Sequence, residues 1–205
     1  MEMERDMQRK GLVVWLTGLS GAGKTTLARA ISNKLASEGL FVETLDGDEV
    51  RESLSRGLGF SQEDRNTNVR RIGFVARLLA RNGVIVLASV ISPYRQARED
   101  VRRMVEDDGA RFVEIFIRCP LDVLVERDVK GLYQKALAGE IAHFTGVSDP
   151  YEEPTSPDLV VDSSIESVEK SAAKILLYLA EIKPLARELS GADRKASISQ
   201  YESAL

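Results

Sequence analysis

Five short apolar runs recur along the chain, and most of them are rich in β-branched residues. Apolar residues that follow one another without polar alternation are typical of parallel strands, because such strands are buried on both faces. Each run is short enough for a strand and too short for a typical helix. We therefore predict buried strands at 12–17, 41–46, 84–90, 111–118 and 158–162.

The segments between these runs have helical spacing. Leu27, Ile31 and Leu35 recur every four residues after the first run, and Gly39 ends that helix. Similar patterns predict further helices from about 49, at 62–81, at 93–107, from 120, near 133–139 and at 164–182. Strands that alternate with helices indicate an α/β fold, with a doubly wound, mostly parallel five-stranded sheet and helices on both faces.

The organisation along the chain points to one domain with a long insertion. A chain of 205 residues is typical of one domain, so we expect residues 1–205 to form one. Residues 128–157 interrupt the alternation with three prolines, several glycines and many polar residues. A loop this long in a compact domain is usually functional or disordered, and we interpret it as a lid. The tail at 184–205 has weak periodicity, which predicts a loose helix or disorder.

Composition narrows the class of protein. The net charge of -4 at pH 7 argues against a general nucleic-acid binder, which is usually basic. Cys119 is the only cysteine, so no internal disulfide can form, as expected in a reducing cytoplasm. No apolar run approaches the roughly 18 residues of a membrane helix, and residues 1–10 lack the apolar core of a secretory signal. We expect a cytoplasmic protein that binds neither nucleic acid nor membrane.

A glycine-rich loop, GLSGAGKT at 18–25, lies between the first strand and the first helix. It fits the pattern G-x-x-x-x-G-K-[ST], whose backbone N–H groups wrap a phosphate at the positive end of a helix dipole. Lys24 would bridge the outer phosphates of ATP, and the Thr25 hydroxyl would hold Mg²⁺. A plain glycine turn is the alternative, which the strand and helix on either side disfavour. The expected nucleotide-binding residues are Gly18, Leu19, Ser20, Gly21, Ala22, Gly23, Lys24, Thr25 and Thr26.

A second group of polar residues lies in the stretch LDGDEVRESLSRGLGF at 45–60. Asp46 and Asp48 follow a strand, and open α/β sheets bind ligands at the carboxyl ends of their strands. An acid there can accept the proton of an attacking hydroxyl, although Asp48 has helix capping as its alternative. Phe60 is either a core residue or a surface on which a base stacks. Arginines that suggest an anionic ligand, though most must be solvated, are Arg51, Arg56, Arg65, Arg70, Arg71, Arg77 and Arg81.

These features together indicate a kinase that acts on a small molecule. The guanine motif N-K-x-D of GTPases is missing, since NKLA at 33–36 lies inside a helix and lacks the acid. His143 is the only histidine, which rules out a histidine-based triad or metal cluster in practice. The rival interpretations are a P-loop kinase for a sugar or antibiotic hydroxyl, and a regulatory nucleotide-binding module with little turnover.

A set of motifs resembles the adenylylsulfate kinase (APS kinase) family over about residues 10–165. They are GLSGAGKTT, LDGDEVR, LGFSQEDR, NVRRIG, ISPYR, KGLYQKALAGEI and FTGVSDPYEEP, and ISPYR and FTG...PYE are specific to that family rather than to P-loop proteins at large. The resemblance implies a P-loop kinase that uses MgATP to phosphorylate the 3'-hydroxyl of adenosine 5'-phosphosulfate (APS). The products would be ADP and PAPS, the activated form of sulfate. The resemblance also suggests a homodimer.

The resemblance further implies roles for individual residues. Asp46 would activate the ribose hydroxyl with Asp48 beside it, and Phe60 and Phe144 would hold the adenine from either side. Packing within the lid is the alternative for Phe144. Candidate catalytic residues are Lys24, Asp46 and Ser92. The remaining contacts to APS are expected from Arg51, Arg65, Asn68, Ile91, Ser92, Lys130 and Leu132.

Ser92 has two interpretations besides substrate contact. The matching serine of the family has been called a phosphoserine intermediate, but direct transfer between two bound nucleotides needs no covalent relay. Ser92 also suits a helix N-cap just before Pro93. The chain departs from the family pattern at Thr67, where glutamate is usual, and at Val129, where proline is usual. We expect these departures to affect turnover or affinity and to leave the reaction unchanged.

Overall fold

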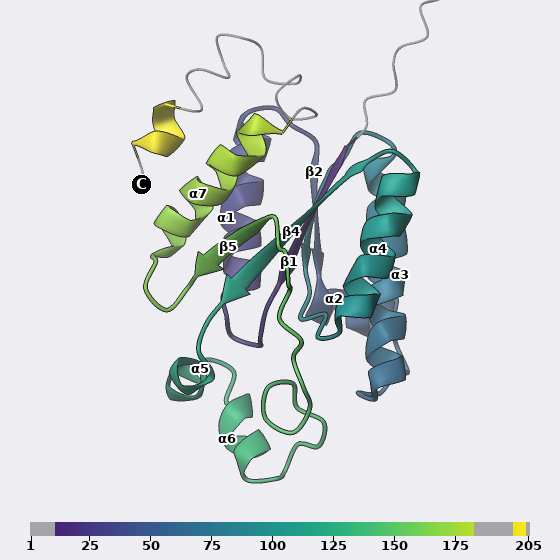
Figure 1. Ribbon diagram of the computed structural model, residues 1–205, viewed down its shortest axis with the longest axis vertical. Coiled ribbons are helices and arrows are strands. Elements are labelled where there is room, and N and C mark those ends of the chain that lie inside the picture. The colour runs from purple at the N-terminus through teal and green to yellow at the C-terminus, as the bar shows by residue number, and fades with distance from the viewer. Residues whose placement is uncertain (1–10, 183–198, 204–205) are drawn as a thin grey trace, which may run out of the picture.

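The computed structural model describes residues 11–182 and 199–203, and within them five parallel strands form one sheet (Figure 1). The order across the sheet is β2-β3-β1-β4-β5, so the chain starts in the middle, builds one edge and then builds the other. This is the doubly wound α/β arrangement, and the predicted fold class is confirmed. The strands are β1 (Leu12–Thr17), β2 (Val42–Asp46), β3 (Ile85–Ser89), β4 (Arg111–Arg118) and β5 (Leu159–Asp162).

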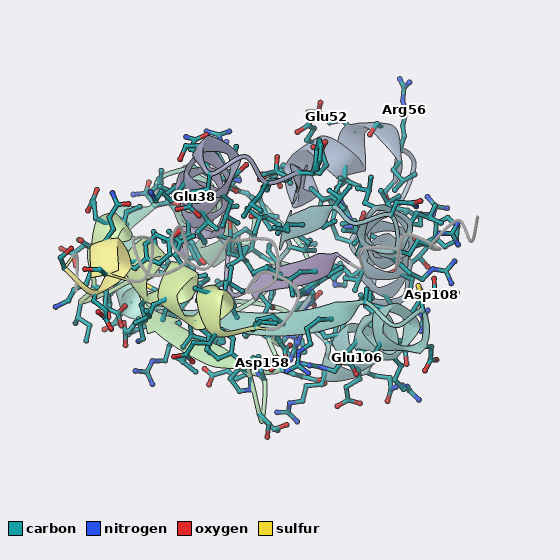
Figure 2. The ribbon with its side chains drawn as sticks, turned by 90° about the horizontal axis from the view of Figure 1, so that it is seen from above. Glu38, Glu52, Arg56, Glu106, Asp108 and Asp158 are labelled. Atoms are coloured by element: carbon teal, nitrogen blue, oxygen red, sulfur yellow. The ribbon has the colours of Figure 1, made fainter. Side chains whose placement is uncertain are left out.

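Helices cover both faces of the sheet. In Figure 1, α1 and α7 lie on one face and α3 and α4 on the other, while α5 and α6 lie beyond the end at which the strands finish. Figure 2, seen from above, shows the sheet between these two layers. The helices are α1 (Lys24–Ser37), α2 (Gly47–Ser53), α3 (Gln62–Ala80), α4 (Arg95–Asp107), α5 (Leu121–Arg127), α6 (Leu132–Leu137) and α7 (Val168–Glu181).

The central strand explains why the apolar runs show no alternation. Leu12, Val14 and Leu16 of β1 pack into a core with α1 and α7, whereas Val13 and Trp15 pack into a second core with α3 and α4. Both faces of β1 are therefore buried, which requires apolar side chains at every position. The edge strand β2 is different, because its residues are half-buried or exposed, and the expectation of a fully buried strand there is wrong.

Two helices start later than predicted, one without any side-chain cap and one with a serine cap further along the chain. Helix α4 begins at Arg95 after an extended Tyr94, so Pro93 lies in the preceding loop and does not open the helix. Helix α7 begins at Val168, where the Ser167 hydroxyl accepts the N–H of Lys170 at 3.2 Å. The boundary of α3 matches the prediction to within one residue.

Part of the C-terminal tail packs against α1. Residues 199–203 form a helical turn in which Tyr201 is buried and donates its hydroxyl hydrogen to Glu38 Oε1 at 2.7 Å. Lys34 of the same helix donates to the side chain of Gln200 at 2.8 Å. This turn is the part of the tail that the structure describes, and positions 184–198 and 204–205 lie outside the described residues.

A glycine permits the close approach of α3 and α4. A Cβ built on Gly73 would lie 2.5 Å from Cγ2 and 2.7 Å from Cγ1 of Val101, whose side chain is fully buried. Alanine normally stabilises a helix by about 1 kcal/mol relative to glycine, but overpacking a core costs about 1–3 kcal/mol. We expect Gly73→Ala to lower the free energy of unfolding by about 1 kcal/mol, measured by urea denaturation.

The matched control is the same change with the obstructing side chain shortened. In a Val101→Ala background the clash is relieved, so Gly73→Ala should be neutral or stabilising there, and the double-mutant cycle should show a favourable coupling. Equal effects of Gly73→Ala in both backgrounds would contradict the proposed contact.

Candidate active site

The loop between β1 and α1 has the backbone of an anion-binding loop. Gly18 has a φ of 150°, and a Cβ there would lie 2.4 Å from the carbonyl oxygen of Ile117. Gly23, with a φ of 96°, precedes α1, whose N-terminus has no side-chain cap. The first N–H groups of this 14-residue helix are therefore left for a ligand, and the helix dipole favours a negative one.

Lys24 is buried in this loop with only 8% of its surface exposed. Its Nζ donates to the carbonyl oxygens of Gly18 at 3.0 Å and Leu19 at 2.8 Å. Burial, reinforced by the nearby charge of Lys130, lowers the pKa of Lys24 to about 8. Burial removes water from the charged ammonium group and so destabilises it. A bound phosphate would stabilise that charge, so this environment favours an anionic ligand.

Asp46 connects the nucleotide loop to the second strand. Its Oδ2 accepts the hydroxyl hydrogen of Thr25 at 2.6 Å, and its Oδ1 accepts the N–H of Asp48 at 3.0 Å. Asp46 is thus the N-cap of α2, so the alternative that Asp48 caps this helix is wrong. Asp48 instead pairs with Lys130.

The oxygen groups beside the nucleotide loop fit a magnesium ion that arrives with a nucleotide. The Thr25 hydroxyl and the carboxylates of Asp46 and Asp48 are hard oxygen donors, which Mg²⁺ prefers. In the described part of the chain no three histidine, cysteine or acidic side chains gather into a metal cluster. Mg²⁺ usually keeps several waters and binds through one or two protein groups plus phosphates, so this sparse donor set suits it.

Phe60 lies opposite the nucleotide loop, on an exposed platform held by two arginines. Its side chain is 56% exposed, so the alternative that it belongs to the core is wrong. The guanidinium of Arg51 lies 4.4 Å from the ring centroid and that of Arg65 lies 5.6 Å away. Arg51 also donates to the carbonyl of Gly59, and Arg65 donates to that of Phe60. The exposed Phe60 ring and the two cations therefore lie together.

The other five arginines between residues 51 and 81 do not line the site and make contacts at the protein surface or point into solvent. Arg70 pairs with Asp100 and Arg77 with Asp108, and Arg71 donates to the carbonyl of Leu54. Figure 2 shows Arg56 pointing away from the body of the molecule, and Arg81 is exposed too. Burial lowers the pKa of Arg51 and of Arg65, which further sets these two apart as cations lacking full hydration.

Residues 128–149, between α5 and the last strand, form the remaining wall. The hydroxyl of Tyr133 on α6 donates to the carbonyl of Ser20 at 2.8 Å, which attaches this segment to the nucleotide loop. The Phe144 ring meets Tyr133 edge-on, with centroids 5.0 Å apart. Arg65 donates to the carbonyl of His143, so the same segment also contacts the platform of Phe60.

Ser92 belongs to the loop 91–94, which we name the acceptor loop. Its φ is 43°, a left-handed conformation that costs about 1–3 kcal/mol in a residue other than glycine. Its hydroxyl accepts from Trp15 Nε1 at 3.0 Å and lies 3.0 Å from the Thr17 hydroxyl. Ser92 therefore does not cap α4, and a hydroxyl buried in this way favours a structural role over covalent phosphoryl transfer.

These elements enclose a cavity of about 770 Å³ among the described residues. Gly18, Leu19 and Ala22 do not line it, because Gly18 and Leu19 present carbonyl groups to Lys24 and Ala22 is buried in the core. The structure places the other candidate residues on its wall, namely Ser20, Gly21, Gly23, Lys24, Thr25, Thr26, Asp46, Asp48, Arg51, Phe60, Arg65, Asn68, Ile91, Ser92, Lys130, Leu132 and Phe144.

Sequence reasoning missed several residues of the wall. Ser89 and Val90 stand at the carboxyl end of β3, where the general rule for open α/β sheets would have found them. Gly47, Val69, Pro93, Ile141 and Thr145 lie inside the quoted family motifs, which could have pointed to them, and the others enter the wall because of how the loops pack. The residues not foreseen are Gly47, Val69, Ser89, Val90, Pro93, Val129, Ile141, Ala142, His143 and Thr145.

None of the helices in residues 11–182 and 199–203 is long and apolar enough to cross a membrane.

Known proteins share both the sequence and the fold of this chain. Residues 10–162 match the family model described as adenylylsulphate kinase. An adenylyl-sulfate kinase of Myxococcus xanthus is 63% identical over 166 residues, which cover 81% of this chain and 89% of that protein. One of Rippkaea orientalis is 54% identical over 184 residues, covering 90% of this chain and 99% of that protein.

A solved structure extends the comparison to three dimensions. It is the Mycobacterium tuberculosis APS kinase in complex with AMPPNP and APS, which is 44% identical and superposes with a TM-score of 0.80. The match covers 83% of this chain and 98% of that one. With a family match over residues 10–162 and this agreement in fold, the chain belongs to the adenylylsulphate kinase family.

Proposed function

We propose that this chain is an adenylylsulfate kinase, which transfers the γ-phosphate of ATP to the 3'-hydroxyl of APS and yields PAPS and ADP. The observation that carries the proposal is one cavity with a phosphate-binding loop on one wall and the Phe60 platform on another. The relative from Mycobacterium tuberculosis was solved in complex with both AMPPNP and APS. Two ligands of this kind suit a cavity that has a phosphate-binding loop on one side and an aromatic platform with two arginines on the other.

In this proposal, the residues of the nucleotide loop hold and polarise ATP. The N–H groups of the loop and of α1 surround the phosphates, and Lys24 leaves its two carbonyl partners to bridge the outer ones. Mg²⁺ bound with ATP would be held by the Thr25 hydroxyl and would neutralise developing charge on the phosphates.

Asp46 is the proposed base. Its carboxylate accepts the proton of the acceptor hydroxyl as that oxygen bonds to the γ-phosphorus and the bond to the ADP oxygen breaks. The hydrogen bonds from Thr25 and from the N–H of Asp48 hold the carboxylate in place before substrate arrives. Positioning of this kind, together with charge neutralisation, accounts for most of the catalysis of phosphoryl transfer.

The opposite half of the cavity would bind APS. Arg51 and Arg65, with Asn68 beside them, would hold the phosphosulfate, while Phe60 and Phe144 contact the adenine. Ile91, Ser92, Lys130 and Leu132 would complete the pocket. We propose that residues 128–157 act as the lid, which excludes water from the reaction.

The proposal extends to assembly and location. We propose that the whole chain, residues 1–205, is one domain that acts as a homodimer in the cytoplasm. The family resemblance supports the dimer, and a single buried free cysteine, Cys119, suits a reducing compartment. Light scattering of the purified protein would test the dimer, since it should report twice the chain mass of 22.6 kDa.

The reaction itself is tested by mixing the purified protein with MgATP and APS and following ADP release while the second product is weighed by mass spectrometry. We expect ADP and a product one phosphoryl group heavier than APS. Binding of ATP without any change in APS would contradict the proposal and would favour a regulatory module or a kinase with another acceptor.

Asp46→Asn separates the chemical role of Asp46 from its structural one. Asparagine caps a helix about as well as aspartate, so α2 should keep its N-cap, but the amide cannot take a proton. We expect kcat to fall roughly 10²- to 10⁴-fold with an unchanged melting temperature. Asp46→Ala is the comparison, because it should lose activity and also about 1 kcal/mol of stability. A loss of kcat smaller than about threefold in Asp46→Asn would remove Asp46 from the role of base.

Phe60→Ala tests the aromatic platform. Loss of base stacking should weaken APS binding by about 1–3 kcal/mol, measured by calorimetry, and should leave ATP binding unchanged. Phe74→Ala is a matched control, because Phe74 is also exposed and has an arginine, Arg77, over its ring, yet it does not line the cavity. Equal APS affinities for the Phe60 variant and the unmodified protein would refute the assignment.

A further inference from the structure

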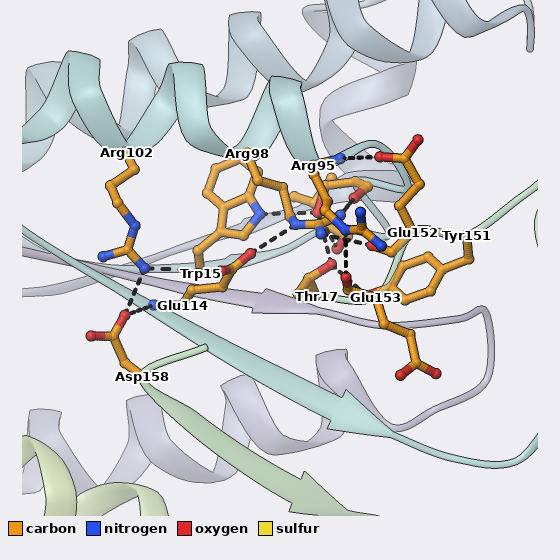
Figure 3. Close-up of polar contacts among 12 residues, drawn as sticks. Trp15, Thr17, Arg95, Arg98, Arg102, Glu114, Tyr151, Glu152, Glu153 and Asp158 are labelled. Carbon is orange, nitrogen blue, oxygen red and sulfur yellow. Dashed lines mark hydrogen bonds and ion pairs between the residues drawn. The ribbon is translucent and has the colours of Figure 1, made fainter. Parts of the chain in front are cut away.

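Arg98 is the only buried arginine of the described residues, with 2% of its surface exposed. Its three nitrogens serve three different segments (Figure 3). Nε donates to Glu114 Oε1 on β4 at 2.7 Å, Nη1 to the carbonyl oxygen of Ser92 at 2.6 Å, and Nη2 to that of Glu152 at 2.7 Å. Arg98 lies outside the cavity wall, so none of these contacts is made to reach a substrate directly.

The first carbonyl belongs to the acceptor loop, at its most strained residue. A left-handed serine such as Ser92 persists only where the surroundings hold it. The Ser92 hydroxyl takes part in a chain of hydrogen bonds. The number of hydroxyl hydrogens fixes which group donates in each bond. Thr17 has one hydroxyl hydrogen and donates it to the carbonyl of Ile91, so Ser92 and Tyr151, which both contact the Thr17 oxygen, are the donors to it.

The second carbonyl belongs to the C-terminal part of the proposed lid, residues 128–157. We name residues 151–153 the lid exit. The N–H of Glu152 donates to the carbonyl of Pro93, and its carboxylate accepts the N–H of Arg95, each at 2.8 Å. Arg95 Nε in turn donates to the carbonyl of Glu153. The lid exit and the acceptor loop are therefore hydrogen-bonded to each other, and Arg98 ties both to β4.

We propose that Arg98 is a positioning residue for the acceptor substrate, acting through the carbonyl groups of Ser92 and Glu152 to fix the acceptor loop and the lid exit as one unit. This inference rests on the proposed function, because the acceptor is taken to be APS. Ile91, Ser92 and Pro93 form part of the cavity wall, so a shift of the acceptor loop changes the shape of that wall. Thr17, just before the nucleotide loop, also contacts the acceptor loop, but the loop's own contact with the proposed lid is a separate one, from the Tyr133 hydroxyl to the carbonyl of Ser20.

The chemistry of the position explains why arginine is needed. A planar guanidinium directs its donors at a carboxylate and at two carbonyl groups at once, whereas an ammonium group is a compact charge on a flexible stem. Glu114 balances the buried charge in either case. Arg98→Lys therefore keeps the ion pair with Glu114 and removes the fixed geometry of the other two contacts.

The kinetic test compares two arginines of the same helix. Arg102 lies one turn further along α4 and pairs with Asp158 at 2.7 Å and with Glu114 at 3.9 Å, but it contacts neither Ser92 nor the lid exit. We expect Arg98→Lys to raise the KM for APS at least tenfold while the KM for ATP stays within twofold. Arg102→Lys should leave both KM values within twofold of those of the unmodified protein.

A spectroscopic test needs no substrate. Trp15 is the only tryptophan, and its indole N–H donates to the Ser92 hydroxyl, so the single indole resonance in a nitrogen–proton correlation spectrum reports on the acceptor loop. We expect this resonance to shift or broaden in Arg98→Lys and to stay in place in Arg102→Lys.

Tyr151→Phe removes only the donor from the lid exit to Thr17, and it should raise the KM for APS severalfold in a protein that remains folded.

The outcomes separate this inference from the proposed function. If the unmodified protein does not phosphorylate APS, the proposed function fails and the acceptor assignment fails with it. If it does, equal changes in the two KM values of Arg98→Lys, or equal effects of Arg98→Lys and Arg102→Lys, would show a general structural role and overturn the inference. An unchanged KM for APS in Tyr151→Phe, with an unmoved indole resonance in Arg98→Lys, would overturn it as well.

Discussion

The position of β3 between β1 and β2 is the constraint on which the whole cavity depends. Ser89 pairs in register with Leu16 of β1 on one side and with Asp46 of β2 on the other. Because all three strands are parallel, their carboxyl ends reach the same edge of the sheet. The nucleotide loop, the proposed base and the acceptor loop all begin there, although they lie far apart along the chain.

Several residues at this edge combine a structural with a functional task. Asp46 caps α2 with one oxygen and accepts from Thr25 with the other, so the helix cap and the proposed base are the same carboxylate. Phe60 is exposed to solvent, yet two arginines hold its position through their contacts with the ring and with neighbouring carbonyls. This kind of arrangement prepares a site before its ligand arrives, which reduces the entropy lost on binding.

The basic side chains of the site and its surroundings fall into three groups by their electrostatic environment. Lys24, Arg51 and Arg65 line the cavity with lowered pKa values caused chiefly by burial, so each gains from an anionic partner. Arg70, Arg77 and Arg102 instead form ion pairs on the outer helices, where solvent weakens them. Arg98 differs from both groups, since it is buried away from the cavity and is paired with Glu114 at 2.7 Å.

Much of the site was accessible from the sequence because its signals are local. The apolar runs predict the strands, and the spacing of glycines with Lys24 and Thr25 predicts the nucleotide loop, since both depend on neighbouring residues. Family motifs also named Asp46, Phe60 and Phe144, and the structure brings all three to the wall of one cavity. The start of α4 was predicted two residues early, because Pro93 suits the first turn of a helix as well as it suits a loop.

Long-range contacts decided the rest. The sequence by itself determined the fold class, the nucleotide loop and the family, because these follow from hydrophobic periodicity and from short motifs with their own geometry. Only the tertiary structure decided that the Thr25 hydroxyl bonds to Asp46, that Arg98 joins Ser92 to Glu152, and that Ser92 turns its hydroxyl toward Trp15. Those outcomes depend on partners up to 77 positions away, and a side chain's neighbours at that distance are set by packing.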